Sequence, residues 1–144
     1  MNKNPQVAMS EGPPAPKRRV FVVEDHPLMR RSIVEAILRE PDFTVCGQAE
    51  DALDVLAIVA TEPDLVLTDL HLKSSSGLDL IKALHTRMPV LPIVATTMFD
   101  VRRNERLARA AGAAGFISKE NGPDRLVATI REVLKKNGKR ASGD

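Results

Sequence analysis

The sequence predicts a doubly wound α/β sandwich built around a parallel, five-stranded sheet. Three observations lead to this fold class. Five short apolar runs rich in Val and Ile have the length of strands that are buried on both faces. Segments with apolar residues at helical spacing separate these runs. Regular alternation of strand and helix joins parallel strands through right-handed crossovers, which places helices on both faces of the sheet.

The expected strands are short and aliphatic. Aromatic residues make up only 3% of the sequence, and Trp and Tyr are absent, so the core must consist of aliphatic side chains. The strands are expected at residues 19–23, 43–49, 64–68, 91–97 and 114–118.

Proline, glycine and apolar spacing set the expected helices. The first helix follows Pro27 and stops near Pro41, because proline suits a first turn and interrupts a helix interior. The fourth begins at Asp100 as the N-cap and ends at Gly112, which suits a left-handed stop. The fifth follows Pro123. The second and third helices are expected over residues 51–61 and 76–87.

Polar residues stand at the carboxyl ends of these strands, where doubly wound folds bind their ligands. Each residue alone is what any loop would carry, but the whole set at matched positions is not expected by chance. The set is Glu24 and Asp25 after the first strand, Asp69 after the third, Thr96 and Thr97 at the end of the fourth, and Lys119 after the fifth.

The residue types in this set suit phosphoryl transfer. Three neighbouring carboxylates repel one another and require a cation, and an all-oxygen ligand set suits Mg²⁺. Beside such a cation, Asp69 can act as a carboxylate nucleophile and form an acyl phosphate. Lys119 can pair with phosphate oxygens, and a threonine hydroxyl can donate a hydrogen bond to them.

Four motifs make the chain resemble the receiver domains of bacterial two-component response regulators. The resemblance covers residues 18–136 and implies a flavodoxin-like fold with strand order 2-1-3-4-5. The Asp-His-Pro run and the Thr-Met pair most resemble receivers that precede LuxR-type helix-turn-helix domains. The motifs are Val22-Val23-Glu24-Asp25-His26-Pro27, Leu67-Thr68-Asp69-Leu70, Ile93-Val94-Ala95-Thr96-Thr97-Met98 and Gly115-Phe116-Ile117-Ser118-Lys119.

The resemblance implies a role for each residue of the site. Glu24, Asp25, Asp69 and the backbone carbonyl of His71 would bind Mg²⁺. Asp69 would be the phosphoacceptor, and Lys119 would pair with the phosphoryl group.

The resemblance also implies a switch. Thr97, which Met98 follows as in the family, would be the switch hydroxyl, and Thr96 is the second choice. Phe116 matches the aromatic residue that changes rotamer with this hydroxyl, although plain core packing explains it almost as well.

The sequence departs from the family pattern beside the phosphoacceptor. Lys73 stands four residues after Asp69, where the family usually has a proline, and three serines follow it, so we expect a looser loop there. His71 and Phe99 lie two positions beyond Asp69 and Thr97. Their bulk leads us to expect a shielded phosphoryl group that hydrolyses slowly.

The expected function is a signalling receiver that a sensor histidine kinase or a phosphotransfer protein phosphorylates. Phosphorylation would switch an output or partner surface and promote a homodimer. The only catalysis expected is the protein's own phosphorylation and dephosphorylation. We expect DNA contact only through an output domain outside this sequence, and no membrane contact.

Two other classes of function stay open at this stage. A receiver fold that works as an interaction module without phosphorylation would show no Mg²⁺-dependent labelling. A flavodoxin-like cofactor enzyme would share the topology, but Glu24 and Asp25 stand where a glycine-rich phosphate cradle would be needed.

Composition is consistent with one domain in a reducing cytoplasm. The chain has 144 residues and a formal net charge of +2, which is too small to indicate nucleic acid by itself. Cys46 is the one cysteine, which excludes a disulfide framework. We expect a disordered leader over residues 1–16, the receiver domain over 17–137 and a frayed tail over 138–144.

Overall fold

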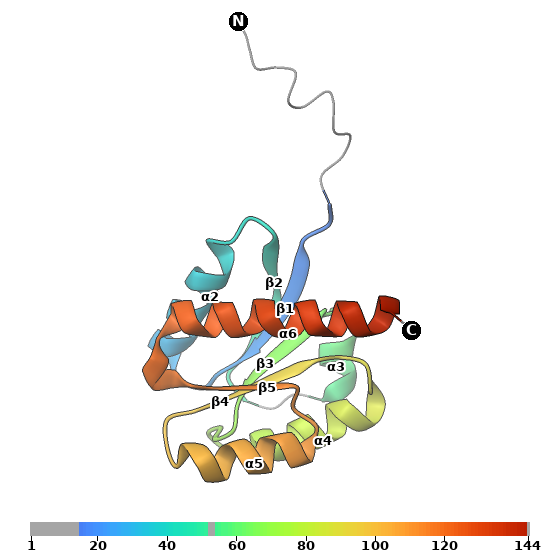
Figure 1. Ribbon diagram of the computed structural model, residues 1–144. Helices are drawn as coiled ribbons and strands as arrows, with labels where there is room; N and C mark the ends of the chain where they lie inside the picture. Colours follow the sequence, from blue (N-terminus) through green and yellow to red (C-terminus); the bar gives the residue numbers. More distant parts are fainter. Residues whose placement is uncertain (1–14, 52–53, 144) are drawn as a thin grey trace, which may run out of the picture.

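The computed structural model describes residues 15–51 and 54–143 and has the fold that the sequence predicts. Its sheet is parallel, with the strands in the order β2-β1-β3-β4-β5, which confirms the expected order 2-1-3-4-5 (Figure 1). The order reverses between β1 and β3, at the place where doubly wound folds bind ligands. The strands are β1 (Arg18–Val23), β2 (Phe43–Ala49), β3 (Leu65–Asp69), β4 (Ile93–Thr97) and β5 (Gly115–Ser118).

Helices cover both faces of the sheet and divide the core into two clusters. Successive strand residues face opposite sides, so Val20 and Val22 belong to one cluster, and Phe21 and Val23 to the other. Residues of α2 and α6 complete the first cluster, and residues of α3, α4 and α5 complete the second (Figure 1). These helices are α2 (Pro27–Leu38), α3 (Val55–Val59), α4 (Gly77–Arg87), α5 (Val101–Ala111) and α6 (Pro123–Gly143).

The helix α3 differs most from the sequence-based expectation. It covers five residues, whereas the apolar spacing predicted a helix over 51–61. The apolar residues at helical spacing in this segment include Leu53, Leu56 and Val59. Leu56 is 50% exposed, and Ile58 is the buried residue of this helix. Leu53 lies outside the described residues. Every residue of this short segment is apolar, so the sequence does not show which face of the helix is buried. Packing against the sheet decides it.

The start of α5 also requires a correction. Asp100 is the residue before the helix, as predicted, but its side chain makes no capping hydrogen bond. Its backbone is left-handed, with φ of 45°, so it does not have the extended conformation of a usual N-cap. At the other end Gly112 has φ of 122°, and its N–H donates to the carbonyl of Ala108, which confirms the expected glycine stop.

The expected domain boundaries lie near the two ends of the chain. Residues 1–14 of the predicted leader lie outside the described residues. The helix α6 runs to Gly143, so its backbone continues past residue 137, where the sequence places the end of the domain. None of the helices in the described part of the chain combines the length and apolar composition that a membrane crossing needs.

The strand registers bring four loops to one edge of the sheet. Val23 of β1 pairs with Thr68 of β3, one residue before Asp69. Asp69 pairs in turn with Thr96 of β4, and Thr97 pairs with Ser118 of β5. The residues that follow these positions therefore meet at the carboxyl edge, as the strand-end pattern predicts.

At the opposite edge, Arg131 of α6 ties the last helix to the start of β2. Its guanidinium donates to Asp42 Oδ2 and to Glu40 Oε1, both at 2.6 Å, and lies 4.6 Å from the ring centroid of Phe43. The hydrogen bond from Arg131 holds the pKa of Asp42 below its ordinary value. This cluster fixes the middle of α6 against the start of β2.

We expect Arg131→Met to lower the free energy of unfolding at neutral pH by about 1 kcal/mol or less, because the pair is partly exposed. Since the folded-state pKa of Asp42 is depressed, the stability from this pair is present above its unfolded value of 3.8 and is lost as the pH falls through the folded value. Urea unfolding of both proteins at pH ~7 and pH ~3.5 should show the difference shrinking with acid. The exposed Arg125→Met on the same helix is the control, and a difference that grows in acid would contradict the assignment.

Candidate functional site

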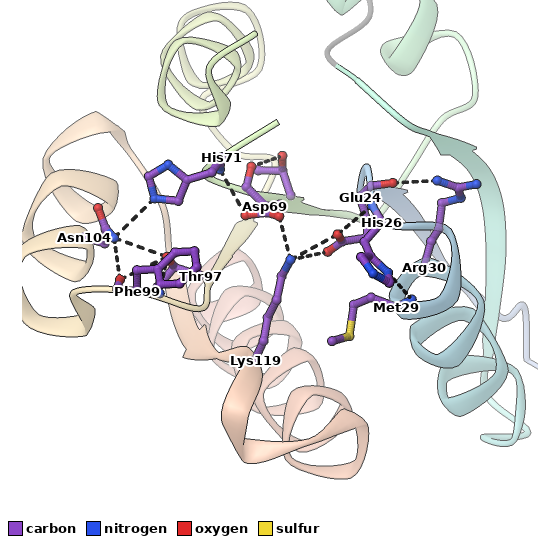
Figure 2. Close-up of polar contacts among 11 residues, drawn as sticks. Glu24, His26, Met29, Arg30, Asp69, His71, Thr97, Phe99, Asn104 and Lys119 are labelled. Atoms are coloured by element: carbon purple, nitrogen blue, oxygen red, sulfur yellow. Dashed lines mark hydrogen bonds and ion pairs between the residues drawn. The ribbon is translucent and has the colours of Figure 1, made fainter. Parts of the chain in front are cut away.

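A buried ion pair joins the carboxyl ends of β1 and β3 to the residue after β5. Lys119 Nζ lies 2.6 Å from Asp69 Oδ2 and 2.8 Å from Glu24 Oε1 (Figure 2). The exposed fraction is 1% for Glu24 and 5% for Asp69. These charged groups therefore lie at or next to strand ends, and all three side chains are almost completely buried.

Glu24 is held from several directions. Its backbone carbonyl accepts a hydrogen bond from Arg30 Nη1 at 2.7 Å, and its Oε2 accepts one from the backbone N–H of His26 at 3.1 Å. Lys119 donates to the same Oε2 at 3.1 Å. Oε1 lies in ion-pair contact with Lys119 but makes no well-aligned hydrogen bond to the described residues. A buried carboxylate oxygen therefore keeps acceptor capacity toward the site.

Burial and charge oppose each other in this pair. Burial raises the pKa of Glu24, and the neighbouring Asp69 adds to the effect, so together they outweigh the ammonium of Lys119. Burial alone would lower the pKa of Lys119, but hydrogen bonds to Asp69 and Glu24 raise it above its usual value. Lys119 thus stays charged in this site. Additional positive charge would stabilise the ionised carboxylates.

Three carboxylates of the site are close enough to share one cation. One oxygen each of Glu24, Asp25 and Asp69 lies within 4.8 Å of the others. Lys119 supplies a single positive charge against these three groups. The donor set is all oxygen, and Glu24 Oε1 keeps free acceptor capacity, so the residues fit a hard divalent ion such as Mg²⁺.

The loop after β3 is shaped around Asp69. The backbone N–H of His71 donates to Asp69 Oδ1 at 3.0 Å, and Thr68 Oγ1 donates to the Asp69 carbonyl at 3.0 Å. The start of α4 passes so close that a Cβ on Gly77 would collide with that carbonyl and lie 2.7 Å from Cα of Leu70. Glycine at this position therefore lets α4 lie against the loop. The role of the His71 carbonyl as a metal ligand stays a prediction.

Side-chain hydrogen bonds tie the loop after Asp69, which was expected to be looser than in the family, to the loop after β2. Whether it is looser than in the family stays a prediction. Asp51, in the loop after β2, accepts hydrogen bonds from the hydroxyls of Ser74 and Ser75 and from the backbone N–H of Ser74 at 3.2 Å. Ser76 caps α4 by accepting from the backbone N–H of Asp79 at 3.3 Å. The three serines that stand near the missing proline thus hold the loop through their side chains.

The two threonines at the end of β4 face opposite sides of the sheet, as neighbours in a strand must. Both are buried. Thr96 lines a hollow with Lys119 and Met29 on the α2 side. Thr97 turns toward α5, where its hydroxyl contacts Phe99 and Asn104 (Figure 2).

Phe116 is half-buried and packs against the cluster beneath α3, α4 and α5. It pairs with Ala95 in the sheet and so lies on the same side as Thr97. This placement is consistent with both readings of Phe116, and its role as a switch aromatic stays a prediction.

The structure adds two residues that the sequence analysis did not single out. Asn104 carries a buried amide that reaches Thr97, Phe99 and His71. The sequence contained a signal for Asn104, because this polar residue stands at helical spacing from Ala108 and Ala111, which face the core. Asp51 had no comparable signal, since the serines that it binds are 23 and 24 residues away.

Comparison with known proteins agrees with this geometry. A family model described as the response regulator receiver domain matches residues 20–131. Among curated proteins, a nitrate/nitrite response regulator protein homolog of Haemophilus influenzae is 30% identical, over 81% of this chain and 57% of that protein. The DNA-binding transcriptional activator DevR/DosR of Mycobacterium tuberculosis is 30% identical, over 80% of this chain and 54% of that protein. The chain thus spans little more than half the length of these relatives.

Solved structures are similar along most of the chain. A LuxR-family two-component response regulator from Aurantimonas superposes with a TM-score of 0.78 and 29% identity, covering 83% of this chain and 86% of that one. The signal receiver domain of the putative response regulator NarL from Mycobacterium tuberculosis gives a TM-score of 0.76 at 28% identity, covering 84% and 98%.

We expect Gly77→Ala to lower the free energy of unfolding by about 1–3 kcal/mol, because the new methyl group pushes on the Asp69 carbonyl. Helix propensity alone would favour alanine, although by less than the ~1 kcal/mol of a helix interior because Gly77 is the first residue of α4, so the sign separates the two effects. Urea unfolding measures the change, with Lys82→Ala at an exposed position of α4 as the control. A variant as stable as the wild type would show that the close approach is not a constraint.

Proposed function

The chain belongs to the family of response regulator receiver domains, and we propose that Asp69 is the residue on which it accepts a phosphoryl group. The observation that supports this role is the buried pair of Asp69 with Lys119, in which a carboxylate at a strand end faces a fixed ammonium at 2.6 Å. The same ammonium is in place to neutralise oxygens added to Asp69. In this role the protein is a regulator that carries a phosphoryl group, and its catalysis is confined to its own phosphorylation and dephosphorylation.

The proposed reaction needs few groups from the protein. A carboxylate oxygen of Asp69 attacks the phosphorus of the donor and forms an acyl phosphate bond. The bond from phosphorus to the donor breaks, and the donor keeps the electron pair and is protonated. Lys119 pairs with the phosphoryl oxygens, and the backbone N–H of His71 holds the carboxylate in orientation through Asp69 Oδ1.

Glu24, Asp25 and Asp69 are the side chains that we propose as Mg²⁺ ligands, together with the His71 carbonyl. Bound there, the ion would offset the repulsion between the carboxylates and the incoming anion. Burial and the neighbouring Asp69 raise the pKa of Glu24, and a cation bound there would offset both effects.

We propose a sensor histidine kinase or a phosphotransfer protein as the phosphoryl donor. A hollow beside the site, next to Lys119 and His26, is lined by Met29, Ile33 and Leu126 and could receive apolar side chains of such a donor. Leu28 on its border is exposed. An output or partner surface would respond when Thr97 moves toward the phosphoryl group, and dimer formation is one such response.

A phosphorylation-independent interaction module is the less favoured function. It would not require a lysine and three carboxylates to remain together at the cost of burial, whereas phosphoryl transfer uses each of them.

Incubation of the full chain with acetyl phosphate should add one phosphoryl group only when Mg²⁺ is present, because the carboxylates repel the donor otherwise. Asp69→Asn should show no adduct, while Asp79→Asn, at an exposed carboxylate in the first turn of α4, should be labelled like the wild type. Intact mass measures the adduct. A folded wild type that is labelled neither by acetyl phosphate nor by a histidine kinase would favour the interaction module.

The adduct should be lost faster in His71→Ala and in Phe99→Ala, because each removes bulk that keeps water from the acyl phosphate. We expect a rate increase of about two- to tenfold, equivalent to about 0.4–1.4 kcal/mol of activation free energy. The loss is followed by intact mass after the donor is removed. Met98→Ala, on the same loop, is the control, and unchanged rates in both variants would contradict the shielding role.

A further inference from the structure

We propose that Asn104 is a positioning residue that restrains Thr97 and thereby opposes switching in the unphosphorylated protein. This inference rests on the proposed function of Asp69 and Thr97. It concerns a side chain on α5 that none of the proposed phosphoryl-transfer steps uses.

Asn104 occupies a position where an amide requires explanation. Its exposed fraction is 7%, and the other buried residues of α5 are Ala108 and Ala111. A polar side chain in such a place is retained only with hydrogen-bond partners, because an unpaired buried amide is unfavourable. Its partners therefore indicate what the residue does.

The partners of Asn104 all lie at the rim of the site. Its Nδ2 donates to the carbonyl of Phe99 at 2.6 Å and to the hydroxyl of Thr97 at 3.2 Å. The same nitrogen lies 3.4 Å from Nε2 of His71, in the loop that follows Asp69. Figure 2 shows the amide between His71 and the Thr97–Phe99 turn, apart from the Lys119 ion pair.

The hydroxyl of Thr97 is fully engaged in this arrangement. A hydroxyl has one hydrogen to donate and two lone pairs to accept with. Thr97 Oγ1 donates to the Phe99 carbonyl at 3.2 Å, and it accepts from the Phe99 N–H at 3.3 Å and from Asn104 at 3.2 Å. Donation to a phosphoryl oxygen on Asp69 therefore requires Thr97 to stop donating to the Phe99 carbonyl. A turn of the side chain from α5 toward Asp69 would also move the hydroxyl away from Asn104.

Asn104 makes that departure less favourable. When Thr97 turns away, the buried amide loses an acceptor, and the Phe99 carbonyl loses one of its two donors. A single hydrogen bond of this kind has a net effect of about two- to tenfold on an equilibrium. Because Asn104 belongs to α5, the position of this helix is linked to the state of the Thr97 hydroxyl.

A purely structural role for Asn104 makes a different prediction. If the amide only stabilises the turn after β4, its loss lowers stability but has no specific link to Thr97. A double-mutant cycle between Asn104 and Thr97 separates the two roles, since only a restraint acting through Thr97 disappears when the hydroxyl is absent.

The experiment measures the affinity of the full chain for fluoroberyllate, which forms a tetrahedral phosphoryl-like adduct on carboxylates, in the presence of Mg²⁺. We expect Asn104→Ala to bind about two- to tenfold more tightly than the wild type. In the Thr97→Val background the same substitution should change the affinity less than about twofold. Amide NMR of the unliganded Asn104→Ala variant should also show the Phe99 signal displaced toward its position in the adduct.

Asn137→Ala is the matched control, because that amide also donates to a loop carbonyl, Val90 at 3.4 Å, but at the opposite edge of the sheet. Asn104→Leu, which fills more of the vacated space, replaces Asn104→Ala if the latter does not fold. Equal affinities of wild type and variant, or an equal gain with and without the Thr97 hydroxyl, would overturn the proposal. Absence of any adduct on the wild type would instead contradict the proposed function of Asp69.

Discussion

The buried ammonium of Lys119 is the contact on which the architecture of the site depends. It joins Glu24 at the end of β1 to Asp69 at the end of β3, across 95 and 50 residues of sequence. Removing either partner of such a pair would leave a charge with little solvent, so the strand ends are constrained to stay together. The pair is also incomplete, because three carboxylates share the region with one ammonium. A site held together by an ion pair and still short of positive charge is suited to take up a cation.

Close packing turns this electrostatic arrangement into a defined geometry. Gly77 lets α4 lie against the carbonyl of Asp69, and Asp51 ties down the serines between them. The loop that follows Asp69 is therefore held at both ends, by the sheet before it and by the helix after it. Neither contact involves a charged group of the proposed reaction. Both limit where the carboxylate of Asp69 can point, and a reaction that proceeds by positioning depends mainly on such restraint.

The sequence was informative where local pattern and tertiary environment agree. All five strands and the strand-end residues could be predicted, because strands buried on both faces are continuously apolar and parallel strands end at a common edge. The cap at Asp100 and the inward face of α3 could not, because packing against the sheet decides both. Asp51 depends on serines that only the fold brings close, whereas the partners Thr97 and Phe99 of Asn104 are near in sequence and the residue was overlooked. The roles assigned to Glu24, Asp25, Asp69, Lys119 and Thr97 remain predictions, although their placement agrees with those roles.

Switching in this protein can be considered as a competition for one hydroxyl. In the unphosphorylated state Thr97 donates to a neutral carbonyl, that of Phe99, and accepts from the amide of Asn104. A phosphoryl group on Asp69 would offer charged oxygens, to which hydrogen bonds are about twice as strong as to neutral acceptors. The difference of about 1–2 kcal/mol corresponds to a population shift of about 5- to 30-fold. Because this difference is so small, one buried amide on α5 can set the balance between the two states of Thr97.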